Sequence, residues 1–382
     1  MTILFDLFGA QPNGVGSKFH GGGEYSKTVF KALSECLGDN VLIVFYNPEL
    51  FLDEWVLKII EQNGIKEYHV KDYADLAQII SGESIDIYFS GMPYSATGNV
   101  IPDNVRKIGT FHGLRSIECP TDSYEYRYRE GLGSLKSLVK PMFRKRFKNR
   151  AWLSYKESMD QYDDIVCVSN HTKYAIANYY SGLGKNPIVF YTPAKYVVED
   201  TGSSQPLVKE KYVLLMGLNR WEKNGCRGIL ALEGLFDKKL LEEYKVVTVG
   251  QIPKKVHKLM KHEDKYVKLG YVKPQELENL YANCDFFLYP SLNEGFGMPP
   301  LEAMRYGKTC IVSGVCSLPE VCGDAVYYCN PYDIEEIQNR ILMASEKKID
   351  TDKVLKHFRT IVEKQNQDLY GLCEYILNSR TE

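Results

Sequence analysis

The chain alternates, twice over, between short runs of continuously apolar residues and longer amphipathic stretches. In the first series, patterns with helical spacing, such as EYSKTVFKALSECL and EWVLKIIEQNG, separate the apolar runs. Those runs are typical of buried strands and lie at residues 2–7, 41–46, 85–90, 107–111, 164–169 and 187–191. Strands that are apolar throughout belong to parallel sheets covered by helices on both faces. The alternation therefore predicts an α/β fold.

A polar stretch with Gly, Ser and Pro at 198–210 interrupts this pattern and is typical of a linker. The alternation then resumes with KYVLLMG, YKVVTVG, YVKLG, DFFLYP and KTCIVSG. We predict two doubly wound, Rossmann-like parallel-sheet domains over residues 1–200 and 201–350, and a helical tail over 351–382. Open parallel sheets bind ligands beyond the carboxyl ends of their strands, so the expected site is a cleft between the two domains.

Composition narrows the class of protein only a little. A net charge of -2 gives no general attraction to nucleic acid. The ten cysteines form no C-x-x-C pair, and Cys167, Cys284 and Cys310 lie in apolar runs, so we expect reduced thiols and a cytoplasmic protein. The N-terminal residues have no basic region before their apolar run, which argues against a signal peptide, and no run is long enough to span a membrane.

The stretch NEGFGMPPLEAM at 293–304 places two glutamates, Glu294 and Glu302, around a glycine-containing loop and the start of a helix. Its two prolines favour a first helical turn, and the amides of Phe296, Gly297 and Met298 would lie at the helix N-terminus, where a diphosphate can bind. Glu302, expected in that first turn, could accept hydrogen bonds from the two hydroxyls of a ribose. Two carboxylates around an anion site fit a nucleoside-diphosphate sugar. Alternatively, Glu302 complements the helix dipole and Glu294 is a solvated loop charge.

Residues 290–326, PSLNEGFGMPPLEAMRYGKTCIVSGVCSLPEVCGDAV, resemble the signature of family four of the retaining glycosyltransferases, which have the two-domain GT-B fold. The similarity is strong over about 211–340 and rests on isolated motifs before that. It implies a nucleotide-sugar domain at 201–350, an acceptor domain at 1–200 and a C-terminal helix that crosses back to the first domain. By this resemblance Glu302 holds the donor ribose, Glu294 contacts the transferred sugar, and the donor site includes Gly217, Phe296, Gly297, Met298 and Leu301.

The stretch LLMGLNRWEKNG resembles the basic motif of the same family, in which Arg220 and Lys223 would neutralise the donor diphosphate and the leaving group. The family often has its arginine directly after the glycine, where this chain has Leu218, so Lys223 is the firmer assignment. The alternative is a solvated surface turn. Because Lys223 and helix amides can replace a cation, and because the Asp350 and Asp352 pair fits a helix cap better than a metal site, we expect no metal. We also expect no cofactor.

Two motifs of the first half complete the expected site. The glycines of HGGGEYSK, including Gly22 and Gly23, could bring backbone amides to the diphosphate, although a plain flexible loop explains them as well. His112 follows an expected strand, and the family keeps a histidine there, near the transferred sugar. A packed structural histidine is the alternative.

A basic segment at 136–150 has seven Lys or Arg residues, no acid and apolar residues at helical spacing. It could lie on an anionic membrane or contact an acceptor, and Pro141 suggests a bend within it. A solvated face is the alternative, and a nucleic-acid role lacks an accompanying module. The cations that we assign to a membrane or acceptor surface are Lys136, Lys140, Arg144, Lys145, Arg146 and Lys148.

Together these features predict a retaining, metal-independent hexosyltransferase, cytoplasmic or peripheral on the inner membrane face. Its donor is expected to be of the UDP or GDP type, and its acceptor a glycan or lipid-linked glycan in cell-surface polysaccharide or glycolipid synthesis. A GT-B sugar-nucleotide epimerase, a phosphorylase and a non-catalytic sugar-binding scaffold remain alternatives. A dehydrogenase is less consistent with the sequence, since the chain has no nicotinamide fingerprint.

Overall fold

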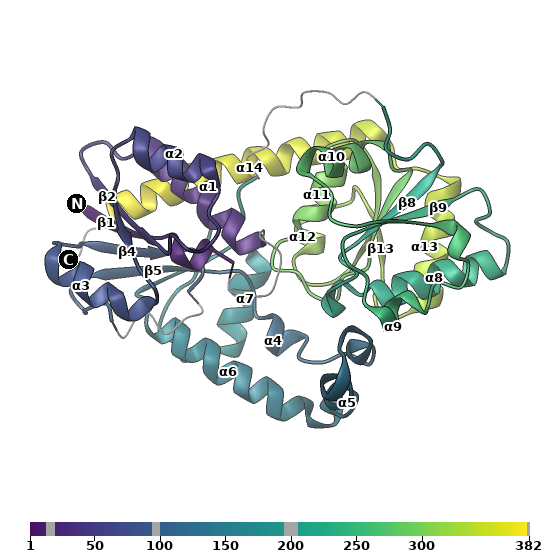
Figure 1. Cartoon of the computed structure of the whole chain (residues 1–382), viewed down its shortest axis with the longest axis horizontal. Coiled ribbons are helices and arrows are strands. Elements are labelled where there is room, and N and C mark those ends of the chain that lie inside the picture. The colour runs from purple at the N-terminus through teal and green to yellow at the C-terminus, as the bar shows by residue number, and fades with distance from the viewer. Residues whose placement is uncertain (13–19, 94–99, 195–204, 380–382) are drawn as a thin grey trace. The chain divides into compact units, whose positions relative to one another are not determined.

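The computed structural model describes residues 1–12, 20–93, 100–194 and 205–379 and divides into two compact units (Figure 1). The first unit consists of Met1–Leu114, Arg150–Tyr196 and Val362–Glu382, and the second of Arg115–Asn149 and Val197–Ile361. The boundary expected at residue 200 lies outside the described residues.

Within the described part of the first unit, seven parallel strands form a sheet in the order β3-β2-β1-β4-β5-β6-β7. The strands are β1 Thr2–Asp6, β2 Val41–Tyr46, β3 Lys66–His69, β4 Ile87–Ser90, β5 Arg106–Phe111, β6 Asp164–Cys167 and β7 Ile188–Val189. The helices and 3-10 turns are η1 Phe8–Ala10, α1 Gly21–Glu35, α2 Glu54–Gln62, η2 Tyr73–Asp75, α3 Leu76–Gly82 and α7 Asn170–Tyr179. The order changes direction between β1 and β4, which makes the carboxyl ends of these two strands the switch point of the sheet.

Six parallel strands form the sheet of the second unit, again counting described residues, in the order β10-β9-β8-β11-β12-β13. They are β8 Tyr212–Met216, β9 Lys245–Val249, β10 Tyr266–Leu269, β11 Phe286–Tyr289, β12 Thr309–Ser313 and β13 Tyr327–Cys329. Here the switch point lies between β8 and β11, so the loops after these neighbouring strands leave the sheet side by side.

Helices cover both faces of the second sheet (Figure 1). These helices and 3-10 turns are η5 Trp221–Lys223, α8 Gly225–Asp237, α9 Lys254–His257, η6 Glu263–Lys265, α10 Pro274–Asn283, α11 Met298–Met304, α12 Leu318–Cys322 and α13 Ile334–Glu346. On one face, Ile229 and Leu232 of α8 and Ile341 of α13 pack with strand residues such as Leu215 and Leu288 in one buried cluster. Full burial of each such side chain contributes about 1.5–3 kcal/mol, so the apolar pattern of the sequence stabilises this layer.

Residues 115–149 pack with the second unit, although the sequence prediction placed them in the N-terminal domain, 1–200. This segment contains α4 Arg115–Glu118, η3 Glu125–Tyr128, α5 Gly131–Val139, η4 Lys140–Phe143 and the start of α6 Arg144–Asp160. The buried guanidinium of Arg227 donates to Asp122 Oδ2 at 3.0 Å, and the amide of Cys226 donates to the hydroxyl of Tyr128 at 3.0 Å. A buried charge pair and a satisfied amide explain why the segment is held there, since either group unpaired would be costly.

Helix α14, Thr351–Asn378, is the expected C-terminal helix, and its residues from Val362 onward belong to the first unit. There Asp368 accepts a hydrogen bond from the amide of Tyr191 at 2.9 Å, and the hydroxyl of Tyr375 donates to Asp164 at 2.9 Å. The prediction of a helix that returns to the first domain is confirmed.

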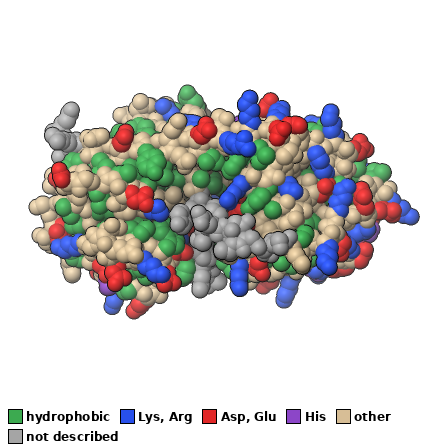
Figure 2. Space-filling model, turned by 90° about the horizontal axis from the view of Figure 1, so that it is seen from above, with side chains coloured by type: hydrophobic (Ala, Val, Ile, Leu, Met, Phe, Trp, Pro, Cys, Tyr) green, Lys and Arg blue, Asp and Glu red, His purple; other side chains and the backbone are tan. Residues whose placement is uncertain are grey.

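All ten cysteines lie within the described residues and are free thiols, and Cys167, Cys284 and Cys310 are buried as expected. Among the described residues, no helix combines the length and apolar character needed to span a membrane. Over the second unit, on the right in Figure 2, acidic and basic side chains are intermixed on the visible face, in keeping with the small net charge.

Candidate functional site

The switch point of the second sheet brings together residues that the sequence predicted as a donor site. Lys223 ends η5, which follows β8, and Glu294 lies in the loop that follows β11. The ammonium of Lys223 donates to Glu294 Oε1 at 2.6 Å, and both side chains are largely buried. Two residues far apart in the sequence thus form one ion pair at the edge where ligands of such sheets bind.

Glu294 Oε1 accepts two further hydrogen bonds, from the Tyr289 hydroxyl at 2.7 Å and from Ser291 Oγ at 2.6 Å. Tyr289 in turn accepts from Lys223 at 2.7 Å. Burial alone would raise the pKa of Glu294, but Lys223 and the two hydroxyls outweigh it and hold the pKa below its usual range. The site therefore keeps a carboxylate anion and an ammonium in fixed positions. Tyr289 and Ser291 were not predicted from the sequence, although both flank the strand end that leads to Glu294.

Glu302 is held by a tyrosine that was likewise not predicted from the sequence. The hydroxyl of Tyr281, a fully buried residue of α10, donates to Glu302 Oε2 at 2.8 Å. Glu302 is the fifth residue of α11 and not, as expected, in its first turn. The misplacement arises because the helix begins at Met298, one residue before the two prolines, and Gly297 occupies the cap position.

The glycines of the motif have packing reasons of their own. Gly297 has φ 112°, and a Cβ there would lie 2.7 Å from Leu318. Gly217 has φ 76°, and its Cβ would lie 2.9 Å from Cγ of Lys223. Both positions exclude other residues through backbone strain and contact. The same helix and loop contain Phe296 and Leu301, which are buried, and Met298, which is half-buried.

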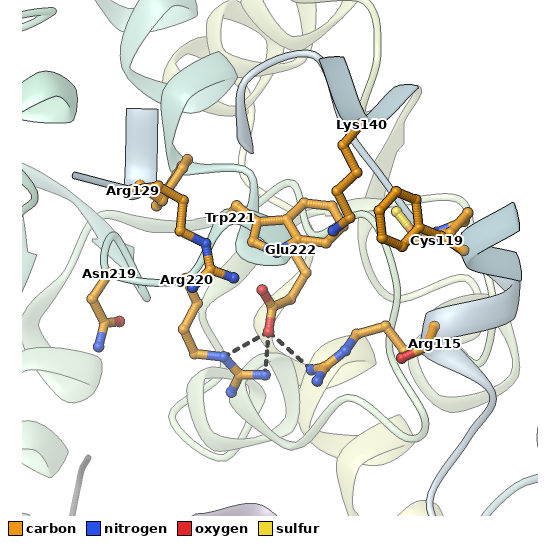
Figure 3. Close-up of a pocket in the computed structure, with 12 residues that line it drawn as sticks. Arg115, Cys119, Arg129, Lys140, Asn219, Arg220, Trp221 and Glu222 are labelled. Carbon is orange, nitrogen blue, oxygen red and sulfur yellow. Dashed lines mark hydrogen bonds and ion pairs between the residues drawn. The ribbon is translucent and has the colours of Figure 1, made fainter. Parts of the chain in front are cut away.

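The side chain of Arg220 makes its hydrogen bonds to Glu222 and not to the pair of Lys223 and Glu294. Its Nε and Nη2 both donate to Glu222 Oε1, at 2.8 and 2.6 Å, and Arg115 Nη1 donates to the same oxygen at 2.9 Å (Figure 3). Leu218, at the place where the family often has arginine, is fully buried. The arginine of this motif is therefore Arg220, and Glu222 holds its guanidinium.

The first unit contains the remaining candidates. His112 follows β5, and its Nε2 lies 2.8 Å from the carbonyl oxygen of Gly91, which can only accept, so Nε2 carries the proton. Burial lowers the pKa of His112 to about 4 despite that hydrogen bond. The ring is therefore neutral near pH 7, with Nδ1 as an acceptor.

Gly22 and Gly23 start helix α1, which His20 caps by accepting from the amide of Gly23 at 3.0 Å. A Cβ on Gly22 would lie 2.0 Å from Met92 Sδ, and one on Gly23 would lie 2.5 Å from the Ala10 carbonyl oxygen. Internal packing thus accounts for both glycines, and their donor-binding role stays a prediction.

The basic segment is exposed and bent, as expected. Lys136, Arg144, Lys145 and Arg146 are exposed, Lys148 is half-buried, and a 3-10 turn at Lys140–Phe143 separates α5 from α6. Lys140 differs from the others because it donates to both oxygens of the buried carboxylate of Glu125, at 2.8 and 3.0 Å. Exposed apolar side chains accompany the cations: Leu132, Leu135, Leu138, Val139, Met142 and Phe143.

Two parallel-sheet, Rossmann-like units of seven and six described strands give the chain the α/β GT-B fold of glycosyltransferases. Residues 199–368 match the family model described as glycosyl transferases group 1.

Two curated Escherichia coli proteins are similar in sequence. The serotype-specific mannosyltransferase WbdA is 25% identical over 384 residues, which cover 88% of this chain and 43% of the relative. The O-antigen chain mannosyltransferase B is 28% identical, over 63% of this chain and 61% of its own length. The chain thus spans less than two thirds of either relative.

Solved structures support the fold. Anabaena Alr3699/HepE, in complex with UDP and glucose, has a TM-score of 0.65 at 14% identity, covering 98% of both chains. The lipopolysaccharide outer core galactosyltransferase WaaB has a TM-score of 0.63 at 16% identity, covering 98% of this chain and 99% of its own. The GT-B prediction is confirmed.

Proposed function

We propose that the protein transfers a hexose from a nucleoside-diphosphate sugar to a glycan or lipid-linked glycan in cell-surface polysaccharide synthesis, with retention of configuration and without a metal. The observation that carries the proposal is the buried ion pair of Lys223 and Glu294 at the switch point. Glu302 follows Glu294 by eight positions and lies on α11. The mannosyltransferase relatives favour mannose as the transferred sugar. The expected nucleotide is of the UDP or GDP type.

Three residues of the second unit have distinct roles in this proposal. Lys223 neutralises the charge that grows on the leaving diphosphate, which stabilises the transition state more than the bound substrate. Glu294 accepts hydrogen bonds from hydroxyls of the transferred sugar. Glu302, oriented by Tyr281, accepts hydrogen bonds from the ribose.

Retention follows from front-face attack, in which the leaving diphosphate takes the proton of the acceptor hydroxyl. Glu294 is not a nucleophile here: its Oε1 already accepts three hydrogen bonds, which lower the nucleophilicity of that oxygen. For His112 of the first unit, the role near the transferred sugar stays a prediction from the sequence.

The exposed cations of the basic segment, together with the exposed apolar side chains of α5 and η4, support the proposal of docking on an anionic membrane face. The cations and the apolar side chains are both accessible, and this combination is typical of helices that lie in the interface of a bilayer. Each cation near an anionic surface contributes about 1 kcal/mol. Lys140 is excluded from this role by its pairing with Glu125.

Transfer is tested by incubating the protein with UDP- and GDP-hexoses and a lipid-linked oligosaccharide, with and without EDTA. We expect a product whose new glycosidic bond has the anomeric configuration of the donor, formed at an unchanged rate in EDTA. An inverted product would contradict the mechanism, and loss of rate in EDTA with rescue by magnesium would contradict metal independence.

A further inference from the structure

A cavity of about 440 Å³ in the second unit is not used by the donor residues Lys223, Glu294 and Glu302. Its walls come from the segment 115–149 and from the loop after β8, both within that unit. The side chains that matter for its chemistry are Arg115, Arg129, Lys140, Arg220, Trp221 and Glu222 (Figure 3).

The cavity is positively charged. Among the described residues that line it, four are cations, and Glu222 is the one carboxylate. Glu222 is buried, and although burial raises the pKa of its carboxyl, Arg220 and Arg115 outweigh that effect and lower the pKa. The anion thus holds two guanidinium groups whose side chains remain 49% and 47% exposed. One carboxylate cannot neutralise both, so an excess positive charge faces the cavity.

The opposite wall combines a further cation with aromatic surface. Lys140 is neutralised by Glu125, and its ammonium lies 5.4 Å from the ring centroid of Phe147 and 5.8 Å from that of Trp221. Arg129 is 54% exposed, and its Nη2 lies as far as 3.9 Å from Glu125 Oε1, the oxygen to which Lys140 already donates at 2.8 Å. The charge of Arg129 is therefore available to a ligand.

Guanidinium groups bind carboxylates and phosphates, and aromatic faces bind the apolar faces of rings. We propose that this cavity binds a sugar of the acceptor that carries a phosphate or a carboxylate group. The inference rests on the proposed function, because it names the class of acceptor, but the cavity can be tested without any transfer reaction.

The charged group could be the phosphate that joins a glycan to its lipid or an acidic sugar within the glycan. Glucose 1-phosphate imitates the first source and methyl α-glucuronide the second, while methyl α-glucoside is the neutral control. Binding is measured by saturation-transfer NMR on the full chain, in the presence of saturating UDP or GDP so that the donor site is filled.

We expect at least one of the two anionic sugars to bind about tenfold more tightly than the neutral one. Glucose 1-phosphate as the better ligand would indicate the lipid-linked source, and the glucuronide the acidic glycan. Arg129→Gln and Arg115→Gln should each weaken this binding several-fold while UDP or GDP affinity stays unchanged. Arg340→Gln, a cation of α13 outside the cavity, should leave both unchanged.

Equal binding of all three sugars, or anionic binding that Arg129→Gln does not weaken, would overturn the proposal. Loss of nucleotide affinity in Arg129→Gln would also overturn it, because the cavity would then be part of the donor site. If no nucleotide binds the wild-type protein, the donor assignment fails, and the sugars are titrated alone to judge the cavity separately.

Discussion

Lys223 and Glu294 lie 71 positions apart in the sequence, yet the lysine ammonium donates to the carboxylate at 2.6 Å. The pair exists because β8 and β11 are neighbours at the switch point of the second sheet, so the segments after both strands meet. An ammonium and a carboxylate held in advance need no rearrangement when charge develops on a donor bound beside them.

Replacing Lys223 with alanine should lower kcat about 100-fold and nucleotide affinity much less, because the charge on the leaving diphosphate is greatest in the transition state. Steady-state kinetics and calorimetry measure the two effects. Equal losses in both would mean that Lys223 acts only in ground-state binding.

The same replacement leaves Glu294 without its ammonium partner in a largely buried position, which destabilises the fold. The double change Lys223→Ala with Glu294→Gln serves as the control. It should recover part of the lost Tm but none of the activity, and recovery of activity would show that the loss came from unfolding.

Glu302→Ala should weaken binding of the nucleoside diphosphate about tenfold, because hydrogen bonds from the ribose to a charged group are lost. Tyr281→Phe removes only the hydroxyl that holds Glu302 and should weaken the same binding by a smaller factor. Calorimetry with each variant decides, and unchanged affinity in Glu302→Ala would refute the ribose assignment.

Gly217→Ala should reduce both stability and turnover. The left-handed φ costs about 1 kcal/mol for a residue with a Cβ, and that Cβ would push against Cγ of Lys223. Gly250 is a matched control, since it has φ 90° and nothing within 4 Å of its Cβ. Gly250→Ala should show a similar fall in Tm and normal kcat, and equal kcat in the two variants would contradict the contact with Lys223.

His112 should contribute to stability in a pH-dependent way. Its folded pKa of about 4 lies below the ordinary 6.5, so between these values the unfolded chain binds a proton that the folded chain does not. The stabilisation is complete above pH 6.5 and is lost as the pH falls from 6.5 to about 4, by at most about 1.4 kcal/mol per pH unit.

Denaturant unfolding of the wild type and of His112→Gln between pH 4 and 7 measures that contribution as the difference in slope. Identical slopes would show that His112 titrates normally. The rate of transfer should show no ionisation of this histidine between pH 5.5 and 8.

Changing Arg144, Lys145 and Arg146 to glutamine should release the protein from anionic vesicles and leave nucleotide affinity intact. The attraction of the wild type should also weaken with salt, since exposed charges more than about 10 Å apart are largely screened at 0.1 M ionic strength. Vesicle sedimentation measures both. The control removes three exposed cations elsewhere in the second unit: Lys254, Lys258 and Lys261. Full vesicle binding by the first variant would mean that the segment only faces solvent.

The sequence predicted most strands because their apolar runs are buried on both faces. It missed β3, whose residues Lys66–His69 are mostly exposed at an edge of the sheet, and β13, Tyr327–Cys329, an edge strand of three residues. Such edge strands form because they pair with a neighbouring strand, and their own residue pattern does not indicate a strand.

The site was predictable where a motif is local and not where contacts are distant. Glu294 and Glu302 share one stretch of sequence, whereas the hold of Tyr281 on Glu302 depends on the packing of α10 against α11. The hydrogen bond from Arg115 to Glu222 likewise depends on the packing of residues 115–149 within the second unit. The expectation of a cleft shared by the two domains, and the roles of Gly22 and Gly23 in it, stay predictions.

The central claim is that the second unit binds a nucleoside diphosphate, and calorimetric titration of the wild-type protein with UDP, GDP, ADP and dTDP tests it most directly. We predict that UDP or GDP binds at one site per chain with a Kd in the micromolar range, which corresponds to a binding free energy of about -8 kcal/mol. The other nucleotides should bind more weakly. Absence of binding by all four nucleotides would contradict the account.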